Sequence, residues 1–384
     1  MYKISVILPS LNVESYIKQC INSVINQTLD DIEIICVDAG STDGTLEILG
    51  DYVNKDSRVK LIHSNKKSYG YQMNLGIKEA NGEYIAIVET DDFIKNTMFE
   101  DLYNLSYNGS IDIVKGNFYH YYGEDNFKKD KDKESLKNTT KKFTLEDKPI
   151  FINGHPSIWA GIYKKKFLYE NNIKFIEEEG GGWVDNPFFF ETAVLAKSII
   201  YTDIGYYYYR ETNPNSSSNS LNDFTIPFKR MIENLEIINK NHFSNEDVFY
   251  YVYLRVFSYL RNVYRRKGCE THMDEMRPYI HKVMLMLNED IILRRFNFNQ
   301  QLEYYKYLSP LKLKEYDELS YEDYILIFKE NNFLYKNLLN LNDSNIILRN
   351  ENQKLRKLNN ELLNSTSWRF TKPLRKFKKL FKKN

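Results

Sequence analysis

The stretch YIAIVETDD (residues 84–92) runs from an uninterrupted apolar segment into three carboxylates within four positions. An apolar run of this kind is typical of a strand that is buried on both faces of a sheet. Carboxylates that lie so close together repel and raise one another's pKa, so the cluster is costly unless a cation or a set of hydrogen bonds compensates for it. A buried strand with this ending therefore predicts a polar site at the edge of a sheet.

The same grouping of an apolar run and a polar loop recurs through the first part of the chain. Strands are expected at residues 4–8, 32–37, 59–63 and 84–88, and amphipathic helices at 14–27, 44–54 and 70–80. This alternation predicts a mostly parallel sheet with helices on both faces. Ligands of such sheets bind at the carboxyl ends of the strands. The loops 9–12, 38–41 and 89–92 follow strands, so we expect them to meet there.

Carboxylates that converge at a strand end most often hold a hard divalent cation. Mg²⁺ or Mn²⁺ bound in this way keeps several waters and takes its remaining ligands from substrate phosphates. The expected partner is then a diphosphate. The structural alternative is that Asp92 or Thr97 caps the helical stretch that follows. Capping explains one acid of the three.

Composition excludes several classes of protein. The 384 residues, 42% of them hydrophobic, allow two or three domains with a substantial core. The 53 basic and 52 acidic residues nearly balance, and the basic residues concentrate in the tail, which argues against nucleic acid as a partner. Three cysteines without CxxC spacing favour a reducing compartment. No signal-peptide core or long apolar run is present, so we expect a cytoplasmic protein.

The chain is expected to divide into four parts. They are an α/β domain at residues 1–220, a helical domain at 221–328, a coiled-coil helix at 329–364 and a basic amphipathic tail at 365–384. The helical domain has long amphipathic stretches and no catalytic motif, so its expected role is a scaffold or an acceptor surface.

The expected coiled coil is a leucine repeat with polar layers. Leucines recur every seven residues at positions 334, 341, 348, 355 and 362, and the other seam position holds Leu338, Asn345, Asn352 and Asn359. This pattern describes a two-stranded parallel coiled coil and predicts a homodimer. The alternative is a single helix on the body of the protein, because three polar layers weaken the zipper.

The tail combines positive charge with large apolar side chains. Residues 365–384 contain eight Lys or Arg and no acid, interleaved with Trp, Phe and Leu. Such a segment suits an anionic membrane surface, which predicts a peripheral protein at the inner membrane face. RNA binding and a solubilising tail are the alternatives.

Four blocks in a fixed order carry a resemblance to a known family. They are ISVILPSLN (4–12), VDAGSTDGT (37–45), NLGI with ANGEYI (74–85) and ETDD (89–92). Together they resemble family 2 of the nucleotide-sugar glycosyltransferases, and a weaker resemblance extends over residues 183–220. The resemblance implies a GT-A fold, which is a Rossmann-like α/β domain that binds a nucleoside diphosphate sugar and holds a divalent metal with a D-x-D motif.

The resemblance also assigns residues on the nucleotide side of the site. Pro9 and Asn12 correspond to positions that line the nucleoside pocket, and Asp38 to one beside the base. Glu89 stands where the family has an aspartate that faces the ribose. Asp91 is then the principal ligand of Mg²⁺ or Mn²⁺.

Further positions complete this expected site. Asn74 belongs with the nucleotide-binding residues, whereas Tyr71 and Asp92 are expected in the acceptor or sugar pocket. Two departures from the family affect the base and the ribose: Ala39 stands where a second acid is usual, and Glu89 replaces the usual Asp.

Asp185, in GGGWVDNP (180–187), fits the family's position for a catalytic base, with Val184 where another acid usually precedes it. A sugar hydroxyl is a poor nucleophile, so a carboxylate that removes its proton accelerates the attack by about 10²- to 10⁴-fold. In-line attack from the opposite face then inverts the anomeric centre. The structural alternative is a helix cap, with Pro187 in the first turn.

Three more side chains are candidates, each with a structural alternative. Arg210 suits bidentate binding of phosphate, or else an ion pair with Glu211. Trp183 offers a stacking face for a sugar, or else packs in the core. His155 is a candidate contact for the acceptor, or else a satisfied structural residue.

These residues predict an inverting, metal-dependent hexosyltransferase. It would move a sugar from a nucleoside diphosphate sugar, with uridine as the family's commonest base, to a hydroxyl of a surface-polysaccharide or lipid-linked glycan. The alternative is a catalytically weak sugar-nucleotide-binding assembly subunit of a polysaccharide synthesis complex. A nucleotidyltransferase would need a Gly-rich basic signature near the N-terminus, and residues 9–20 contain no Gly and one Lys.

Overall fold

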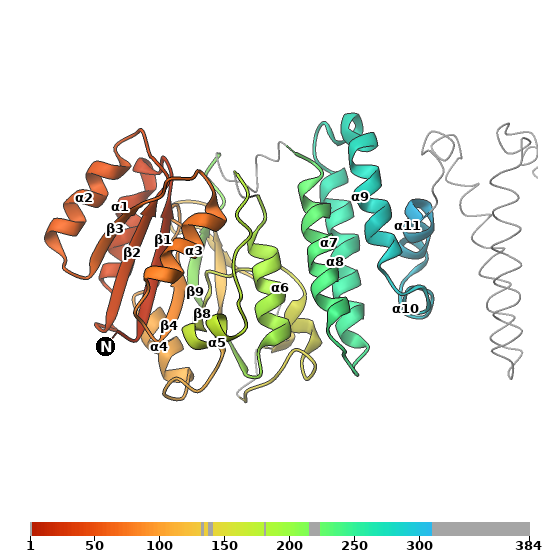
Figure 1. Ribbon diagram of the computed structural model, residues 1–384, viewed down its shortest axis with the longest axis horizontal. Coiled ribbons are helices and arrows are strands. Elements are labelled where there is room, and N and C mark those ends of the chain that lie inside the picture. Colours follow the sequence, from red (N-terminus) through yellow and green to blue (C-terminus); the bar gives the residue numbers. More distant parts are fainter. Residues whose placement is uncertain (1, 132–133, 137–140, 180–181, 215–222, 309–384) are drawn as a thin grey trace, which may run out of the picture. The chain divides into compact units, whose positions relative to one another are not determined.

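The computed structural model in Figure 1 describes most of the first 308 residues. The described ranges are 2–131, 134–136, 141–179, 182–214 and 223–308. The chain divides into two units, Met1–Met286 and Leu287–Asn384. The predicted coiled coil (329–364) and tail (365–384) lie outside the described residues, so the homodimer and the membrane contact stay predictions.

One nine-stranded sheet forms the centre of the first unit, in the order β3-β2-β1-β4-β8-β6-β9-β5, with β7 paired to β6. The strands are β1 (Ile4–Ser10), β2 (Ile32–Asp38), β3 (Val59–His63), β4 (Tyr84–Ile87), β5 (Phe93–Ile94), β6 (Ile113–Tyr121), β7 (Phe127–Lys129), β8 (Gly161–Lys164) and β9 (Ile199–Arg210). β1 runs parallel to β2 and β4, whereas β8 runs antiparallel to β4 and β6. The sheet is therefore parallel on one side and mixed on the other.

The parallel side follows from the sequence. Every residue of β1, β2 and β4 is buried, as expected for apolar strands that are covered on both faces. The α/β class and the parallel arrangement of the first four strands are thus confirmed. Because β1, β2 and β4 are parallel, their carboxyl ends lie at one edge of the sheet.

Helices connect and cover these strands. In the first unit they are α1 (Glu14–Ile25), α2 (Thr45–Lys55), α3 (Tyr69–Glu79), α4 (Met98–Leu105), α5 (Lys165–Glu170), α6 (Asp185–Leu195), α7 (Ile226–Lys240), α8 (Asp247–Tyr264) and α9 (Met273–Leu285), with the short 3₁₀ turns η1 (Glu134–Leu136), η2 (Pro149–Ile152) and η3 (Cys269–His272). The described helices of the second unit are α10 (Glu289–Arg295) and α11 (Phe298–Leu308). Among the described residues, no helix has the length and hydropathy that crossing a bilayer requires.

The helices α7, α8 and α9 lie side by side and belong to the same unit as the sheet (Figure 1). α6 contacts α7, and α8 contacts η2. The sequence suggested a boundary near residue 220, whereas the compact unit continues to residue 286. The physical reason is that α7 and α8 each carry a buried arginine, Arg230 and Arg255, that binds loops of the sheet region.

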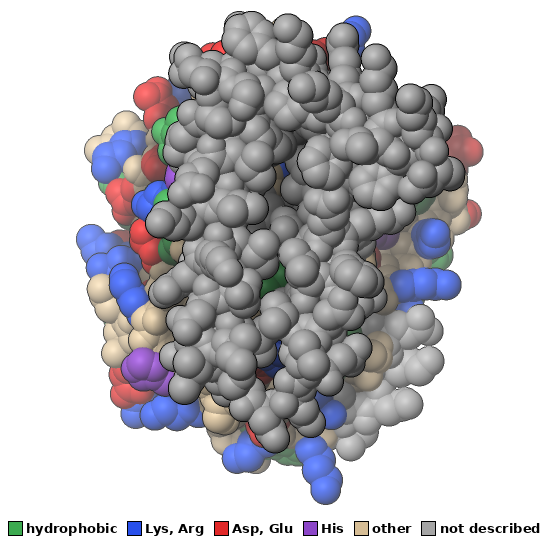
Figure 2. Space-filling view, turned by 90° about the vertical axis from the view of Figure 1, so that its right-hand side faces the viewer, with side chains coloured by type: hydrophobic (Ala, Val, Ile, Leu, Met, Phe, Trp, Pro, Cys, Tyr) green, Lys and Arg blue, Asp and Glu red, His purple; other side chains and the backbone are tan. Residues whose placement is uncertain are grey.

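The described surface is mixed in charge. In Figure 2, Lys and Arg side chains on the visible margin of one face lie among Asp and Glu side chains. This agrees with a formal net charge of +1 for the whole chain.

Candidate active site

The loop after β2 is organised by Asp38, which is fully buried. Its Oδ1 accepts hydrogen bonds from the backbone N–H groups of Gly40 and Ser41, both at 2.8 Å. Its Oδ2 accepts from the hydroxyls of Ser41 at 2.5 Å and Ser10 at 3.2 Å. The carboxylate thus joins the ends of β1 and β2. The predicted position of Asp38 beside the nucleotide base stays a prediction.

The loop after β1 is tied to both neighbouring strand ends. Asn12 has a left-handed backbone with φ of 54°. Its N–H donates to Ser41 Oγ at 2.9 Å, and its Oδ1 accepts from the Thr42 N–H at 2.8 Å. The carbonyl of Pro9 accepts from the Thr90 hydroxyl at 2.7 Å. The loops after β1, β2 and β4 therefore meet, as the strand order predicts.

Asp92, the last acid of the cluster, is only 1% exposed. Its Oδ1 accepts from the Arg210 N–H and its Oδ2 from the Tyr207 hydroxyl, both at 2.7 Å. The same Tyr207 oxygen accepts from the Glu89 N–H at 3.0 Å. Asp92 therefore anchors β9 to the loop after β4, and its predicted place in the acceptor or sugar pocket stays a prediction.

The Arg210 guanidinium is also used within the protein. Its Nε donates to the Asp91 carbonyl at 2.6 Å, and a terminal N–H donates to Gln19. The group lies 5.1, 5.7 and 5.1 Å from the ring centres of Tyr16, Phe93 and Tyr121, which hold it by cation–π contacts. These contacts fix the position of the guanidinium, and its predicted role on the nucleotide side stays a prediction.

Glu211, the other partner considered for Arg210, binds His120 of β6. The ring places Nδ1 2.6 Å from Glu211 Oε1 and Nε2 3.3 Å from Asp130 Oδ2. The hydrogen bonds to Asp130 and Glu211 raise the pKa of His120 to about 9. This clamp fixes the point at which the chain leaves β9.

Because the pKa of His120 is higher in the folded protein than the value of about 6.5 in an unfolded chain, its charged form stabilises the fold. This contribution is complete below about pH 6.5 and is lost as the pH rises through about 9. We expect His120→Gln to lower the free energy of unfolding by about 2 to 3 kcal/mol at pH 6 and by little at pH 10. Urea unfolding of both proteins over this range checks it. A difference that does not change with pH would contradict the clamp.

Glu89 and Asp91 are the acids of the cluster that face the site, and both are half-buried. Glu89 Oε1 accepts from the Tyr69 hydroxyl at 2.6 Å, and Asp91 Oδ2 accepts from Asn213 Nδ2 at 2.8 Å. Burial raises the pKa of Glu89 to about 8, and the charges of Asp91 and Asp185 add to the rise, whereas the Tyr69 hydrogen bond opposes it. The acids after β4 and the acid at the start of α6 therefore share one electrostatic environment.

Asp185 is the first residue of α6, so Val184 holds the N-cap position. The Asp185 side chain is half-buried, and its Oδ1 accepts from Asn186 Nδ2 at 3.1 Å. Burial raises its pKa, and the positive charge of Arg255 opposes that rise. Trp183 precedes it with φ of 61° and packs its ring edge-on against Tyr259, with the centres 5.2 Å apart.

Asn74 joins α3 to the segment that leads towards α6. Its Oδ1 accepts from the Phe175 N–H at 2.9 Å, and its Nδ2 donates to the Phe175 carbonyl at 2.8 Å and to Glu177 Oε1 at 3.0 Å. These bonds hold α3 against residues 175–177, and the predicted role of Asn74 in nucleotide binding stays a prediction. Tyr71, on the same helix, is half-exposed, with Lys66 Nζ 4.4 Å from its ring centre.

His155 lies in an aromatic cluster. Its Nδ1 accepts from the Ser157 N–H at 3.0 Å, and its ring centre is 5.6 to 5.7 Å from those of Phe118, Trp159 and Tyr209. This environment matches the structural alternative that the sequence left open.

Several residues of the site were not found from the sequence. Tyr69 precedes a block that was singled out, and Tyr207 lies in a run of tyrosines without a motif. Arg255 lies in an amphipathic helix that offered no chemical signal. Their partners are distant in the sequence, so only the fold brings them together.

The residues present fit a divalent cation that takes most of its ligands from elsewhere. Among the described residues, no group of three or more His, Cys, Asp or Glu side chains is arranged to hold a metal ion. Asp91 is half-buried, and Asn213 is the one described side chain that donates to it. One or two carboxylates with waters and substrate phosphates are a usual set for Mg²⁺. Asp91 would hold such an ion.

Comparisons with known proteins agree with this geometry. Residues 5–167 match the family model described as "Glycosyl transferase family 2". The chain is 33% identical over 224 residues to the uncharacterized glycosyltransferase EpsJ of Bacillus subtilis, a match to 56% of this chain and 62% of that protein. It is 34% identical over 211 residues to a poly(ribitol-phosphate) beta-glucosyltransferase of Bacillus spizizenii, a match to 54% of this chain and 32% of that protein. The chain thus spans less than two thirds of these relatives.

Among solved structures, residues 1–349 of S. aureus TarS in complex with UDP-GlcNAc superimpose with a TM-score of 0.67 at 22% sequence identity. The superposition covers 79% of this chain and 86% of that one. At this identity the likeness concerns the fold, which is GT-A. The match to glycosyl transferase family 2 covers residues 5–167 and agrees with the resemblance that the sequence carries.

Proposed function

We propose that this chain is an inverting, metal-dependent glycosyltransferase that moves a sugar from a UDP-sugar to a hydroxyl of a surface-polysaccharide or lipid-linked glycan. The observation that carries the proposal is that the loops after β1, β2 and β4 meet, with the half-buried acids Glu89 and Asp91 at the end of β4. The TarS fragment was solved with UDP-GlcNAc, and one relative is named for transfer to poly(ribitol-phosphate). Both names support a UDP-sugar donor and a glycan acceptor.

The side chains divide the chemistry between them. Asp185 takes the proton of the acceptor hydroxyl as its oxygen bonds to the anomeric carbon. The bond from that carbon to the diphosphate breaks, and its electron pair leaves with the diphosphate. Asp91 would hold Mg²⁺ or Mn²⁺, which would supply positive charge to neutralise this leaving group. Attack from the face opposite the diphosphate inverts the anomeric centre.

The second candidate is a catalytically weak sugar-nucleotide-binding subunit that organises partner enzymes. Ala39 and Val184 stand where the family usually has acids, and both are buried, at 3% and 1% exposure. An acid at either place would be buried, which costs free energy unless a partner compensates for its charge. The absence of acids at these two positions is the observation that favours a catalytically weak protein.

Calorimetric titration of UDP, GDP and CDP, with Mn²⁺ or Mg²⁺ and again with chelator, tests the proposal. We expect one nucleotide, UDP, to bind with metal, and chelator to remove that binding. The next measurement is UDP release from UDP-GlcNAc, UDP-glucose and UDP-galactose with alkyl glycosides as acceptors. Binding that is indifferent to metal would remove the mechanism. Metal-dependent binding without turnover of any donor would favour the assembly subunit.

We also propose that the chain is a homodimer and is peripheral at the inner membrane face. This part rests on residues 329–364 and 365–384, which lie outside the described residues. A chain shortened after residue 328 tests it. If that chain stays dimeric, the coiled coil is not what holds the dimer together. If it still sediments with anionic vesicles, the tail is not what binds the membrane.

A further inference from the structure

Arg255 of α8 places a positive charge beneath the proposed active site. The side chain is 2% exposed. It donates to Asn186 Oδ1 at 2.6 Å, to the Tyr259 hydroxyl at 2.9 Å, to the Ile152 carbonyl at 3.2 Å and to the carbonyl of Gly154. A guanidinium stays charged throughout the working range of pH. In the described part of the chain all its hydrogen-bond acceptors are neutral, so the compensating charge must come from farther away.

Asn186 connects this cation to Asp185. The Asn186 side chain is 3% exposed, and its Oδ1 accepts from both Arg255 and the Tyr259 hydroxyl. Two donors at one end of an amide identify that end as the oxygen. The NH₂ group therefore faces the other way, and it donates to Asp185 Oδ1 at 3.1 Å. The Asn186 amide therefore links the two charged groups by hydrogen bonds: its oxygen accepts from Arg255, and its NH₂ group donates to Asp185.

Arg255 is the cation among the groups that act on Asp185. Burial raises the Asp185 pKa, and the Arg255 charge lowers it. The other groups in this environment are Glu89 after β4, Tyr69 of α3, Tyr163 of β8 and Tyr259 of α8. These neighbours are acids or phenols, so without Arg255 the balance moves towards protonation of Asp185.

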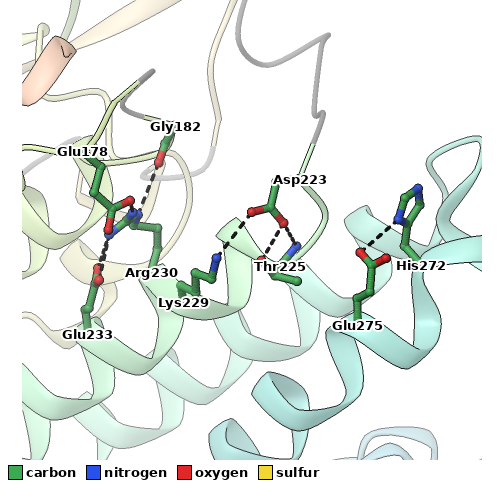
Figure 3. Close-up of polar contacts among 9 residues, drawn as sticks. All are labelled: Glu178, Gly182, Asp223, Thr225, Lys229, Arg230, Glu233, His272 and Glu275. Carbon is green, nitrogen blue, oxygen red and sulfur yellow. Dashed lines mark hydrogen bonds and ion pairs between the residues drawn. The ribbon is translucent and has the colours of Figure 1, made fainter. Parts of the chain in front are cut away.

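A second buried arginine binds the same segment in a different way. Arg230 of α7 is fully buried, and its Nε donates to the Gly182 carbonyl at 3.3 Å (Figure 3). Its charge is paired directly with Glu233, at 2.7 Å, and with Glu178. Arg230 thus supports the chain before Asp185 with a charge that is already neutralised. It provides a matched comparison for Arg255.

We propose that Arg255 is a positioning residue for the transfer reaction: through the amide of Asn186, it holds the Asp185 carboxylate ionised and correctly oriented to accept the proton of the acceptor. The role of Asp185 in this statement rests on the proposed function, whereas the coupling of Arg255 to Asp185 does not. Under this proposal α8, which has no catalytic motif, contributes a residue that positions the base.

The coupling is tested first without any enzyme assay, by a double-mutant cycle on urea unfolding at pH 7. The four proteins are wild type, Arg255→Met, Asp185→Asn and the double variant. We expect Arg255→Met to raise the unfolding equilibrium constant at least about tenfold more when Asp185 is present than in the Asp185→Asn background, which is about 1.4 kcal/mol of coupling. Effects that add within about twofold would overturn the proposal.

The second measurement is the pH dependence of kcat for UDP release, with Mn²⁺ and the UDP-sugar that the wild type uses. Arg255→Met is expected to lower kcat by about 10- to 100-fold with little change in KM, and to move the acid limb of the profile to higher pH. Arg255→Lys should restore part of both effects. Arg230→Met should lower the melting temperature and leave the acid limb where it is.

The outcomes separate the two proposals. If Arg255→Met turns over donor with the wild-type acid limb, the positioning role fails and the proposed function stands. If the wild type turns over no donor but the cycle shows coupling, the proposed function fails and the link between Arg255 and Asp185 stands. If Arg255→Met does not fold, Asn186→Ala keeps both charges and removes the connecting amide. An unchanged profile for Asn186→Ala would then overturn the proposal.

Discussion

Asp185→Asn is expected to lower kcat by about 10²- to 10⁴-fold and to leave the affinity for UDP with Mn²⁺ close to that of the wild type. The substitution keeps the size of the side chain and removes its ability to accept a proton. Asn186 Nδ2 lies 3.1 Å from Asp185 Oδ1, so a neutral amide oxygen can keep this hydrogen bond. The loss therefore reports the chemistry, with the local structure retained. Steady-state UDP release and calorimetry on the same samples separate the two effects.

A matched control for this variant lies at the start of the next helix. Asp223 Oδ1 accepts from the N–H and hydroxyl of Thr225, at 2.7 and 2.5 Å, and its Oδ2 lies 3.4 Å from Lys229 Nζ (Figure 3). Asp223→Asn likewise neutralises an acid beside a helix start, and it should leave kcat unchanged. If Asp185→Asn keeps wild-type kcat while Asp223→Asn does too, Asp185 is not the base.

Asp91→Asn is expected to weaken metal-dependent binding of UDP by at least about 100-fold, to the level seen with chelator. The physical reason is the loss of the carboxylate charge that would hold the cation against the diphosphate. Its partner Asn213, at 2.8 Å, is neutral and supplies no replacement charge. Titration of UDP with and without Mn²⁺ measures this effect.

The control for Asp91→Asn is Asp203→Asn on β9. Asp203 binds Asn117 Nδ2 at 2.9 Å and Lys129 Nζ at 2.5 Å, away from the three converging loops. Its removal should lower stability and leave the metal dependence of UDP binding intact. Equal affinity of wild type and Asp91→Asn for UDP in Mn²⁺ would show that the cation is held elsewhere or is not used.

The parallel half of the fold could be predicted because local signals were sufficient. The strands β1, β2 and β4 are mostly apolar and buried along their whole length, which is the pattern of parallel strands covered on both faces. The mixed half could not be predicted in the same way. β8 pairs with β4 and β6, whereas β6 pairs in parallel with β9 about 80 residues later, and no local pattern specifies such partners.

The acidic cluster shows where prediction of the site stopped. The sequence identified three carboxylates whose proximity needed compensation, and in the structure each one accepts hydrogen bonds from different donors. Asp92 bonds to β9, Glu89 to Tyr69 and Asp91 to Asn213. These partners lie 20 to 122 residues away, so spacing alone could not reveal them. The rings around Arg210 likewise come from three separate segments, so the sequence alone did not indicate its cation–π contacts.

The continuity of the first unit has a consequence for protein engineering. The family match ends at residue 167, yet Asp185 is supported by Arg230 and Arg255 from helices well beyond it. A chimaera joined near residue 220 would combine an Asp185 segment with helices that did not evolve beside it. An exchange of residues 1–286 between relatives would keep Asp185 together with both arginines that support its segment.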